Sequence, residues 1–68
     1  MSITREIQYK GKTIRITVAM NERGTYVGTY RVADTDPLVT GKGADSSSED
    51  AAFSNAERRV KEVLDRQS

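Results

Sequence analysis

Side chains in the first half of this chain alternate between polar and apolar, and this alternation constrains the fold more than any other feature. In residues 2–9 the odd positions carry Ile3, Ile7 and Tyr9, while the even positions are polar. A period of two residues places successive side chains on opposite faces of a β-strand. Three segments alternate in this way, and the sequence predicts strands at about 2–9, 13–21 and 25–33.

Two glycine-containing turns between these strands fix how they pair. Gly11, after Lys10, can adopt the positive φ of a two-residue hairpin turn, and Gly24 can do the same at the end of a three-residue loop. The first turn sets Ile7 opposite Ile14, and a slip of one residue would scatter the apolar side chains over both faces. The sequence therefore predicts an antiparallel meander with one defined register.

This register gathers the strongly apolar strand residues on one face of the sheet, with Val27 as the exception. Gly28 lies on the same face, where its missing side chain would let a helix approach closely. The predicted buried face comprises Ile3, Ile7, Tyr9, Ile14, Ile16, Val18, Met20, Tyr26, Tyr30 and Val32.

The last third of the chain has a helical period. Ser47 is the predicted N-cap, with Asp50 at the third helical position and a helix over about 48–66. Acid-first pairs four residues apart, which stabilise a solvated helix face, are Glu57 with Lys61 and Glu62 with Arg66. The apolar face comprises Ala52, Phe53, Ala56, Val60, Val63 and Leu64.

Residues 34–48, between the strands and the helix, are the least regular part of the chain. Within them, residues 38–40 have the composition of a short edge strand, so that both a three-stranded and a four-stranded sheet remain open. The prediction is one α+β domain over 1–68. Its architecture is a two-layer sandwich, an antiparallel meander sheet covered by one C-terminal amphipathic helix.

Composition narrows the chemistry that this chain can perform. Its 68 residues contain neither Cys nor His, which removes the usual general base, the thiolate nucleophile and the soft ligands of transition metals. We therefore expect no enzyme activity, no catalytic residues, no metal site and no cofactor. Absence of Cys, of a signal-peptide pattern and of a long apolar run favours a cytoplasmic protein without a membrane partner.

Two short motifs in the irregular segment have both a functional and a structural interpretation. Thr40-Gly41-Lys42-Gly43 is glycine-rich like a phosphate-binding loop, yet it lacks the first Gly and the final Ser or Thr of that pattern. Asp34 and Asp36 supply alternate carboxylates for a divalent cation but no further ligands. We interpret the first motif as a flexible loop and the second as a turn before Pro37.

The solvated face of the predicted sheet carries the one site that deserves a test. The register places Arg15 directly opposite Arg31, with Glu6 beside them, and like charges that face each other destabilise a sheet. An anion between the two arginines would relieve this repulsion. Lys10 and Lys12, in the adjacent turn, would extend the patch toward a nucleic-acid backbone.

Several motifs resemble a known group of proteins. They are Tyr26-Val27-Gly28-Thr29-Tyr30, Ser48-Glu49-Asp50-Ala51, and Ala56, Val60 and Leu64-Asp65. They resemble short proteins of unknown function from Burkholderia and related proteobacteria, in which a three- or four-stranded sheet precedes a helix opening with Ser/Thr-x-Glu-x-Ala. This resemblance covers most of the chain and implies a fold but no activity. A looser similarity is to three-stranded DNA-binding domains of plant AP2 factors and integrases, which read DNA with Arg and Trp on the sheet.

Two functional hypotheses follow from the sequence. The first is a non-enzymatic protein-interaction module that binds an unknown protein or itself, because a small core often gains stability from a partner at a sheet edge. The alternative is weak binding of nucleic acid or another anion through the open sheet face. A net charge of only +1 argues against a general polyanion binder.

Overall fold

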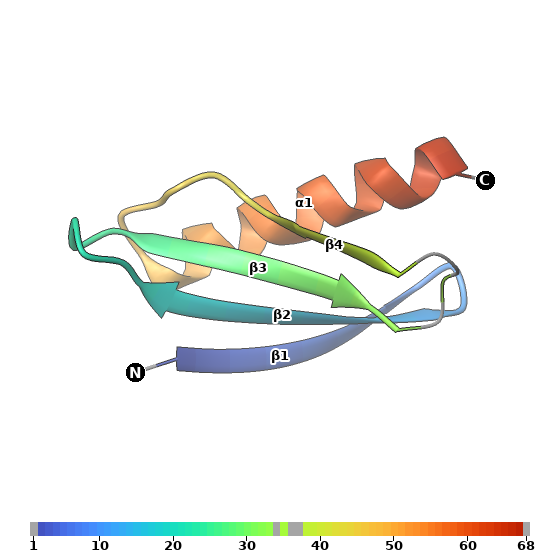
Figure 1. The fold of residues 1–68 in the computed structure, drawn as a ribbon, viewed down its shortest axis with the longest axis horizontal. Helices are drawn as coiled ribbons and strands as arrows, with labels where there is room; N and C mark the ends of the chain where they lie inside the picture. Colours follow the sequence, from blue (N-terminus) through green and yellow to red (C-terminus); the bar gives the residue numbers. More distant parts are fainter. Residues whose placement is uncertain (1, 34, 36–37, 68) are drawn as a thin grey trace.

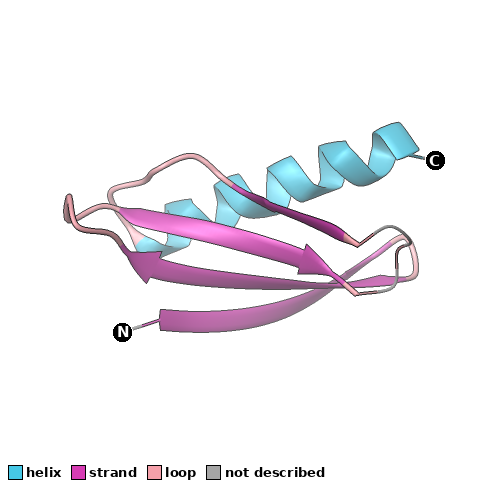
Figure 2. Ribbon diagram, viewed as in Figure 1, coloured by secondary structure: helices cyan, strands magenta, loops and turns pink. Residues whose placement is uncertain are grey.

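A four-stranded antiparallel sheet is covered on one face by a single C-terminal helix (Figure 1). The computed structural model describes residues 2–33, 35 and 38–67. Neighbouring strands follow one another in chain order, which confirms the predicted α+β meander with the fourth strand formed (Figure 2). The elements are β1 (Ser2–Tyr9), β2 (Lys12–Met20), β3 (Tyr26–Val32), β4 (Val39–Lys42) and α1 (Glu49–Gln67).

The predicted register is confirmed in both hairpins. Ile7 pairs with Ile14 and Ile16 pairs with Tyr30, as the turn positions require. Gly11 and Gly24 adopt positive φ angles of 76° and 82°. Lys10 does so as well, with a φ of 52°, in a conformation that a side chain normally disfavours. Both turns therefore depend on left-handed backbone, which fixes the pairing of every residue behind them.

β4 is one residue later and one residue longer than the segment predicted for it, because it includes Gly41 and Lys42. The interpretation of Thr40-Gly41-Lys42-Gly43 as a loop is therefore wrong for its first three residues, whereas Gly43 follows the strand. Gly41 is selected by packing: a side chain there would collide with the Tyr30 ring, whose Cζ lies 2.5 Å from the ideal Cβ position. The Thr35 hydroxyl also steadies the turn, since it donates to Val32 O and accepts the N–H of Val39, each at 3.1 Å.

The helix begins one residue later than predicted, and its cap is Ser48 rather than Ser47. Ser48 Oγ accepts the backbone N–H of Ala51 at 3.2 Å, and its carbonyl accepts the N–H of Ala52 at 3.1 Å. This is the geometry of an N-cap three residues before its hydrogen-bond partner. Glu49 and Asp50 consequently occupy the first turn, where negative charge favours the helix dipole.

The core lies between α1 and the central strands, and the helix approaches the sheet closely at Gly28. An ideal Cβ at Gly28 would lie 2.9 Å from both Ala52 O and Ala56 Cβ. Gly43 meets the same turn of the helix, with an ideal Cβ 2.8 Å from Ala56 N. The core residues are Ile14, Ile16, Val18, Tyr30, Val32, Val39, Ala52, Phe53, Ala56, Val60 and Leu64.

The helix does not cover the whole apolar face of the sheet, and here the sequence prediction is partly wrong. α1 packs on β2, β3 and β4, whereas β1 lies at the edge farthest from it (Figure 1). Ile3 and Met20, which were predicted to be buried, keep 37% and 57% of their surface exposed. The reason is geometric: the helix packs chiefly on β3 and β2, where Gly28 lets it approach closely, and one helix is too narrow to cover four strands.

The glycine contact gives a test of this packing. Gly28→Ala should lower the free energy of unfolding by roughly 1–3 kcal/mol, because the added methyl group meets helix backbone and cannot be relieved by a side-chain rotation. Urea denaturation followed by circular dichroism measures the change. Thr29→Ala, at the neighbouring exposed position, is the control and should have a smaller effect. Equal stability of Gly28→Ala and the native chain would contradict this account.

Candidate functional site

β1 forms one edge of the sheet, and its free backbone groups can be assigned from the ladder. Asn21 N–H donates to Thr25 O at 2.8 Å, so the odd residues of β2 bond to β3. The even residues of β2 therefore bond to β1, where their partners are Ile3, Arg5 and Ile7. Because backbone hydrogen bonding alternates along a strand, the N–H and C=O groups of the even residues of β1 point away from the sheet. These residues are Ser2, Thr4, Glu6 and Gln8.

Apolar surface adjoins this free edge. Ile3 lies on the helix side of β1, and Met20 lies on the same side at the end of β2, beside half-buried Tyr26. We call the outward backbone of β1 together with Ile3 and Met20 the β1 surface. Single exposed apolar residues are ordinary on protein surfaces. Here, however, two of them lie on one face of the sheet, close to the edge where the N–H and C=O groups of β1 are unpaired. This arrangement is suited to the addition of another strand.

Arg5 occupies the helix side of β1 between Ile3 and Ile7. Its guanidinium carbon lies 4.2 Å from the centroid of the Phe53 ring, and its Nη2 lies 3.8 Å from Asp50 Oδ1. A hollow of about 290 Å³ lies here, floored by Ile7, Ile16 and Phe53. Arg5 therefore covers part of the core that the helix leaves open, while its charge stays in contact with water.

The open face of the sheet carries a row of threonines and, beside it, the two predicted arginines. Thr4 and Thr17 share a hydrogen bond of 3.0 Å between their hydroxyls. Arg15 pairs directly with Arg31, as predicted, and Arg15 Nη2 lies 3.6 Å from Glu6 Oε1. Arg31 forms no ion pair with any residue that the structure describes. The structure thus brings Arg15, Arg31 and Glu6 together as predicted.

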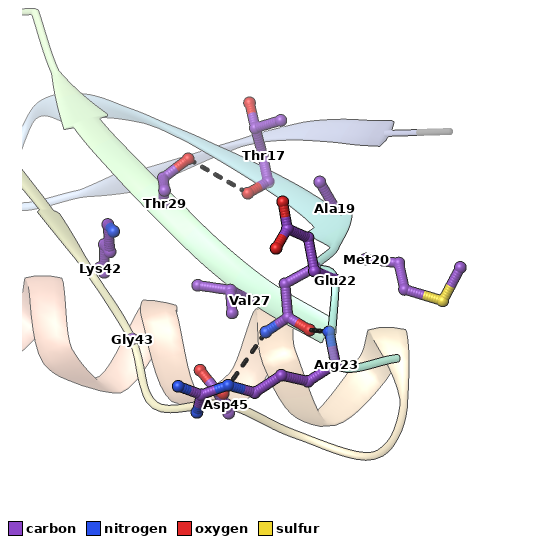
Figure 3. Close-up of a pocket in the computed structure, with 11 residues that line it drawn as sticks. Thr17, Ala19, Met20, Glu22, Arg23, Val27, Thr29, Lys42, Gly43 and Asp45 are labelled. Atoms are coloured by element: carbon purple, nitrogen blue, oxygen red, sulfur yellow. Dashed lines mark hydrogen bonds between the residues drawn. The ribbon is translucent and has the colours of Figure 1, made fainter. Parts of the chain in front are cut away.

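A hollow on this face lies away from the arginines, near the β2–β3 loop. It measures about 570 Å³ and is bordered by β2, β3 and the segment that follows β4. Figure 3 shows Thr17, Val27, Thr29 and Lys42 along it, with Asp45 at one end. Neither Arg15 nor Arg31 lines it. An anion bound between these arginines would therefore rest on a flat sheet and remain largely hydrated.

The other two predicted contact residues, Lys10 and Lys12, are not brought to the open face. Lys12 pairs with Tyr9, on the helix side of the sheet. Lys10 Nζ lies 2.6 Å from Asp65 Oδ1, near the C-terminal end of α1, and Tyr9 Oη donates to the same oxygen at 2.9 Å. No local sequence signal points to this cluster, because Asp65 is 56 residues from Tyr9 in the chain.

The cluster shifts the pKa of each of its members. Hydrogen bonds from Lys10 and Tyr9 lower the pKa of Asp65, because they favour its ionised form. The hydrogen bond from Lys10 to Asp65 raises the pKa of Lys10, and the hydrogen bond from Tyr9 to Asp65 raises the pKa of Tyr9. At neutral pH the cluster is therefore a charged carboxylate held by an ammonium group and a neutral phenol. It ties the first hairpin to the end of the helix.

Within the described part of the chain, no group of three or more His, Cys, Asp and Glu side chains could hold a metal ion. Asp34 and Asp36, whose carboxylates the sequence analysis weighed as cation ligands and interpreted as part of a turn, lie outside the described residues. No described helix is long and apolar enough to span a bilayer.

Comparisons with protein families, with curated proteins and with solved structures find no match to this chain. The resemblance to the short proteobacterial proteins therefore stays a prediction. Functional inference rests on the geometry of the chain itself.

The Asp65 cluster predicts a pH-dependent contribution to stability. A lowered carboxyl pKa stabilises the folded state above the ordinary value of about 4, and this contribution is lost as the pH falls through the lowered pKa. Asp65→Asn should therefore be less stable than the native chain at pH 7, with the difference shrinking below about pH 4. Thermal melts from pH 2 to pH 8 measure it. A difference independent of pH would contradict the assigned role.

Proposed function

We propose that this chain is a non-enzymatic interaction module that associates with a second copy of itself through the β1 surface. One observation supports this most strongly: Ile3 and Met20, placed by the register on the core face, remain exposed beside the free edge of β1. A small domain buries a limited fraction of its surface, so a contact that covers these residues adds stability. The cysteine-free composition is compatible with the cytoplasm as its location.

The pattern of β1 favours a second copy over an unrelated strand. Antiparallel pairing of two β1 strands can set Thr4 of each copy opposite Glu6 of the other, so that outward backbone groups meet. This register also sets Ile3 of each copy opposite Ile7 of the other copy on the helix side. The same surface is therefore used by both copies, as a two-fold dimer requires. Arg5 then meets Arg5 at the axis, where Asp50 of each copy offsets the charge.

Proline substitution in β1 separates the free edge from the paired one. Thr4→Pro removes an outward N–H without breaking a bond to β2, so the chain should stay folded and become monomeric. Thr4→Ala removes the hydroxyl but keeps the N–H, and should still associate. Arg5→Pro removes an N–H that bonds to β2, and should destabilise the fold itself.

Sedimentation equilibrium measures the association state, and circular dichroism confirms that each variant is folded. The proposal fails if the native chain is a monomer at millimolar concentration. It fails equally if folded Thr4→Pro associates as well as the native chain does. Destabilisation by Thr4→Pro as strong as that by Arg5→Pro would show that the assignment of the free edge is wrong.

A second candidate function is anion binding between Arg15 and Arg31. It is supported by their direct pairing and by the fact that only Arg15 has a carboxylate nearby among the described side chains. Like charges directly opposite each other destabilise a sheet, and a bound anion would relieve this cost in the folded state alone.

Phosphate should therefore raise the melting temperature of the native chain more than chloride does at matched ionic strength. Arg31→Thr removes the like-charge pair and keeps a strand-compatible side chain, so this extra gain should disappear. Because phosphate also stabilises proteins by exclusion from their surface, the comparison between the two chains is the measurement that counts. An equal gain in both would exclude an anion site between these arginines.

A further inference from the structure

The charges of α1 are segregated between its two flanks. Toward β1, its acids are paired: Asp50 with Arg5, Glu57 with Lys61, and Asp65 with Lys10. Toward β4, the helix carries Arg58 and Arg59, with Glu62 as the acid nearest them. The near-zero net charge of the chain therefore conceals a flank that is locally positive.

On this flank the structure forms another hollow, of about 420 Å³, between α1 and the end of β4. Arg58, Arg59 and Asn55 line it from the helix, while Lys42 and Gly43 line it from the strand. Its two walls are held close together because Gly43 packs on Ala56 and because Gly43 N–H donates to Gly28 O at 2.8 Å. The spacing between the helix and β4 is thus fixed by glycine contacts.

The position of Arg58 is fixed by neighbouring side chains. Its Nη2 donates to Asn55 Oδ1 at 2.9 Å, and Asn55 Nδ2 in turn donates to Ser46 Oγ at 2.6 Å. Ser46 lies in the segment between β4 and α1, and its backbone forms an isolated bridge with Tyr26 at the start of β3. One hydrogen bond leaves most of the guanidinium donors of Arg58 available, in an orientation set before a ligand arrives.

We propose that this hollow binds a phosphoryl group, held by the guanidinium groups of Arg58 and Arg59 with Lys42 as an additional positive charge. A guanidinium presents two parallel N–H donors that match phosphate oxygens, and a lysine adds attraction without fixed geometry. Three cations against the single carboxylate of Glu62 leave the site with the excess positive charge that a phosphoryl dianion neutralises. The weak Arg59–Glu62 pair, at 3.9 Å and exposed, is easily exchanged for such a ligand.

This site is independent of the proposed dimer contact, because it lies at the opposite edge of the sheet (Figure 1). It is also distinct from the Arg15–Arg31 pair, whose side chains lie on the open face. A free nucleotide and a nucleic-acid backbone are the two sources of such a group, since both present anionic phosphate oxygens that accept hydrogen bonds from a guanidinium. The experiment separates these two sources.

The test uses ¹⁵N-labelled protein and two probes, inorganic phosphate and a single-stranded oligonucleotide of about 12 nucleotides. Phosphate should shift the side-chain Nε–Hε signals of Arg58 and Arg59 and the amide signal of Gly43 more than chloride does at equal ionic strength. Arg58→Gln/Arg59→Gln should weaken binding at least about tenfold, the loss expected when charge-assisted hydrogen bonds are removed. Arg23→Gln/Arg66→Gln removes two charges elsewhere and should change it less than about twofold.

Each outcome decides the matter. The proposal is overturned if neither probe shifts the Arg58 and Arg59 signals. It is also overturned if the two double variants lose the same amount of affinity, because binding would then follow net charge alone. If the oligonucleotide binds at least about ten times more tightly than inorganic phosphate, and if its affinity falls steeply with salt, the source is a nucleic-acid backbone. Similar affinity for both probes would identify a small phosphorylated ligand. Thermal melts of all variants check that each is folded.

Discussion

The close approach of α1 to β3 at Gly28 determines the rest of this structure. Ala52 and Ala56 of the helix rest on a strand position without a side chain, and Gly43 allows a similar approach beside it. Small residues on both sides let the backbones come close, so the helix packs chiefly on β3 and on the adjacent β2. The contacts that the helix makes at the two sheet edges follow from this placement.

The first consequence is the unequal treatment of the two sheet edges. β1 keeps a free row of backbone groups and exposed Ile3, since the helix packs chiefly on β3 and β2 and meets β1 through side chains such as Asp65. Arg5 compensates in part by stacking on Phe53. An inward-pointing charge on an edge strand commonly discourages uncontrolled pairing. Here Arg5 stacks on Phe53 and lies 3.8 Å from Asp50, so the same residue is compatible with one specific contact.

The second consequence is electrostatic. Because the acids of the helix flank nearest β1 are used in ion pairs, the flank nearest β4 is left with Arg58 and Arg59 beside a strand that contributes Lys42. Charges that cancel over the whole chain are therefore separated in space. Composition alone suggests a protein indifferent to anions, whereas the surface has one side on which an anion is favoured.

The sequence by itself determined the first three strands, their register, the helix and its apolar face, because these depend on local periodicity and on the φ angles that Gly11 and Gly24 permit. It also determined that Arg15 faces Arg31, since register alone settles cross-strand neighbours. A small error arose where adjacent residues of one type can serve equally, as Ser47 and Ser48 can for the cap. Glycines 41 and 43 indicated a loop, although their smallness serves packing against Tyr30 and Ala56.

Only the tertiary structure decided where the helix lies across the sheet, and with it which apolar residues stay exposed. Periodicity states which face of each element is apolar, but the lateral position of a helix on a sheet depends on side-chain volumes summed over distant segments. For the same reason the Tyr9–Lys10–Asp65 cluster and the Asn55–Arg58 arrangement have no local signature. Contacts between residues far apart in the chain arise only after the layers have packed.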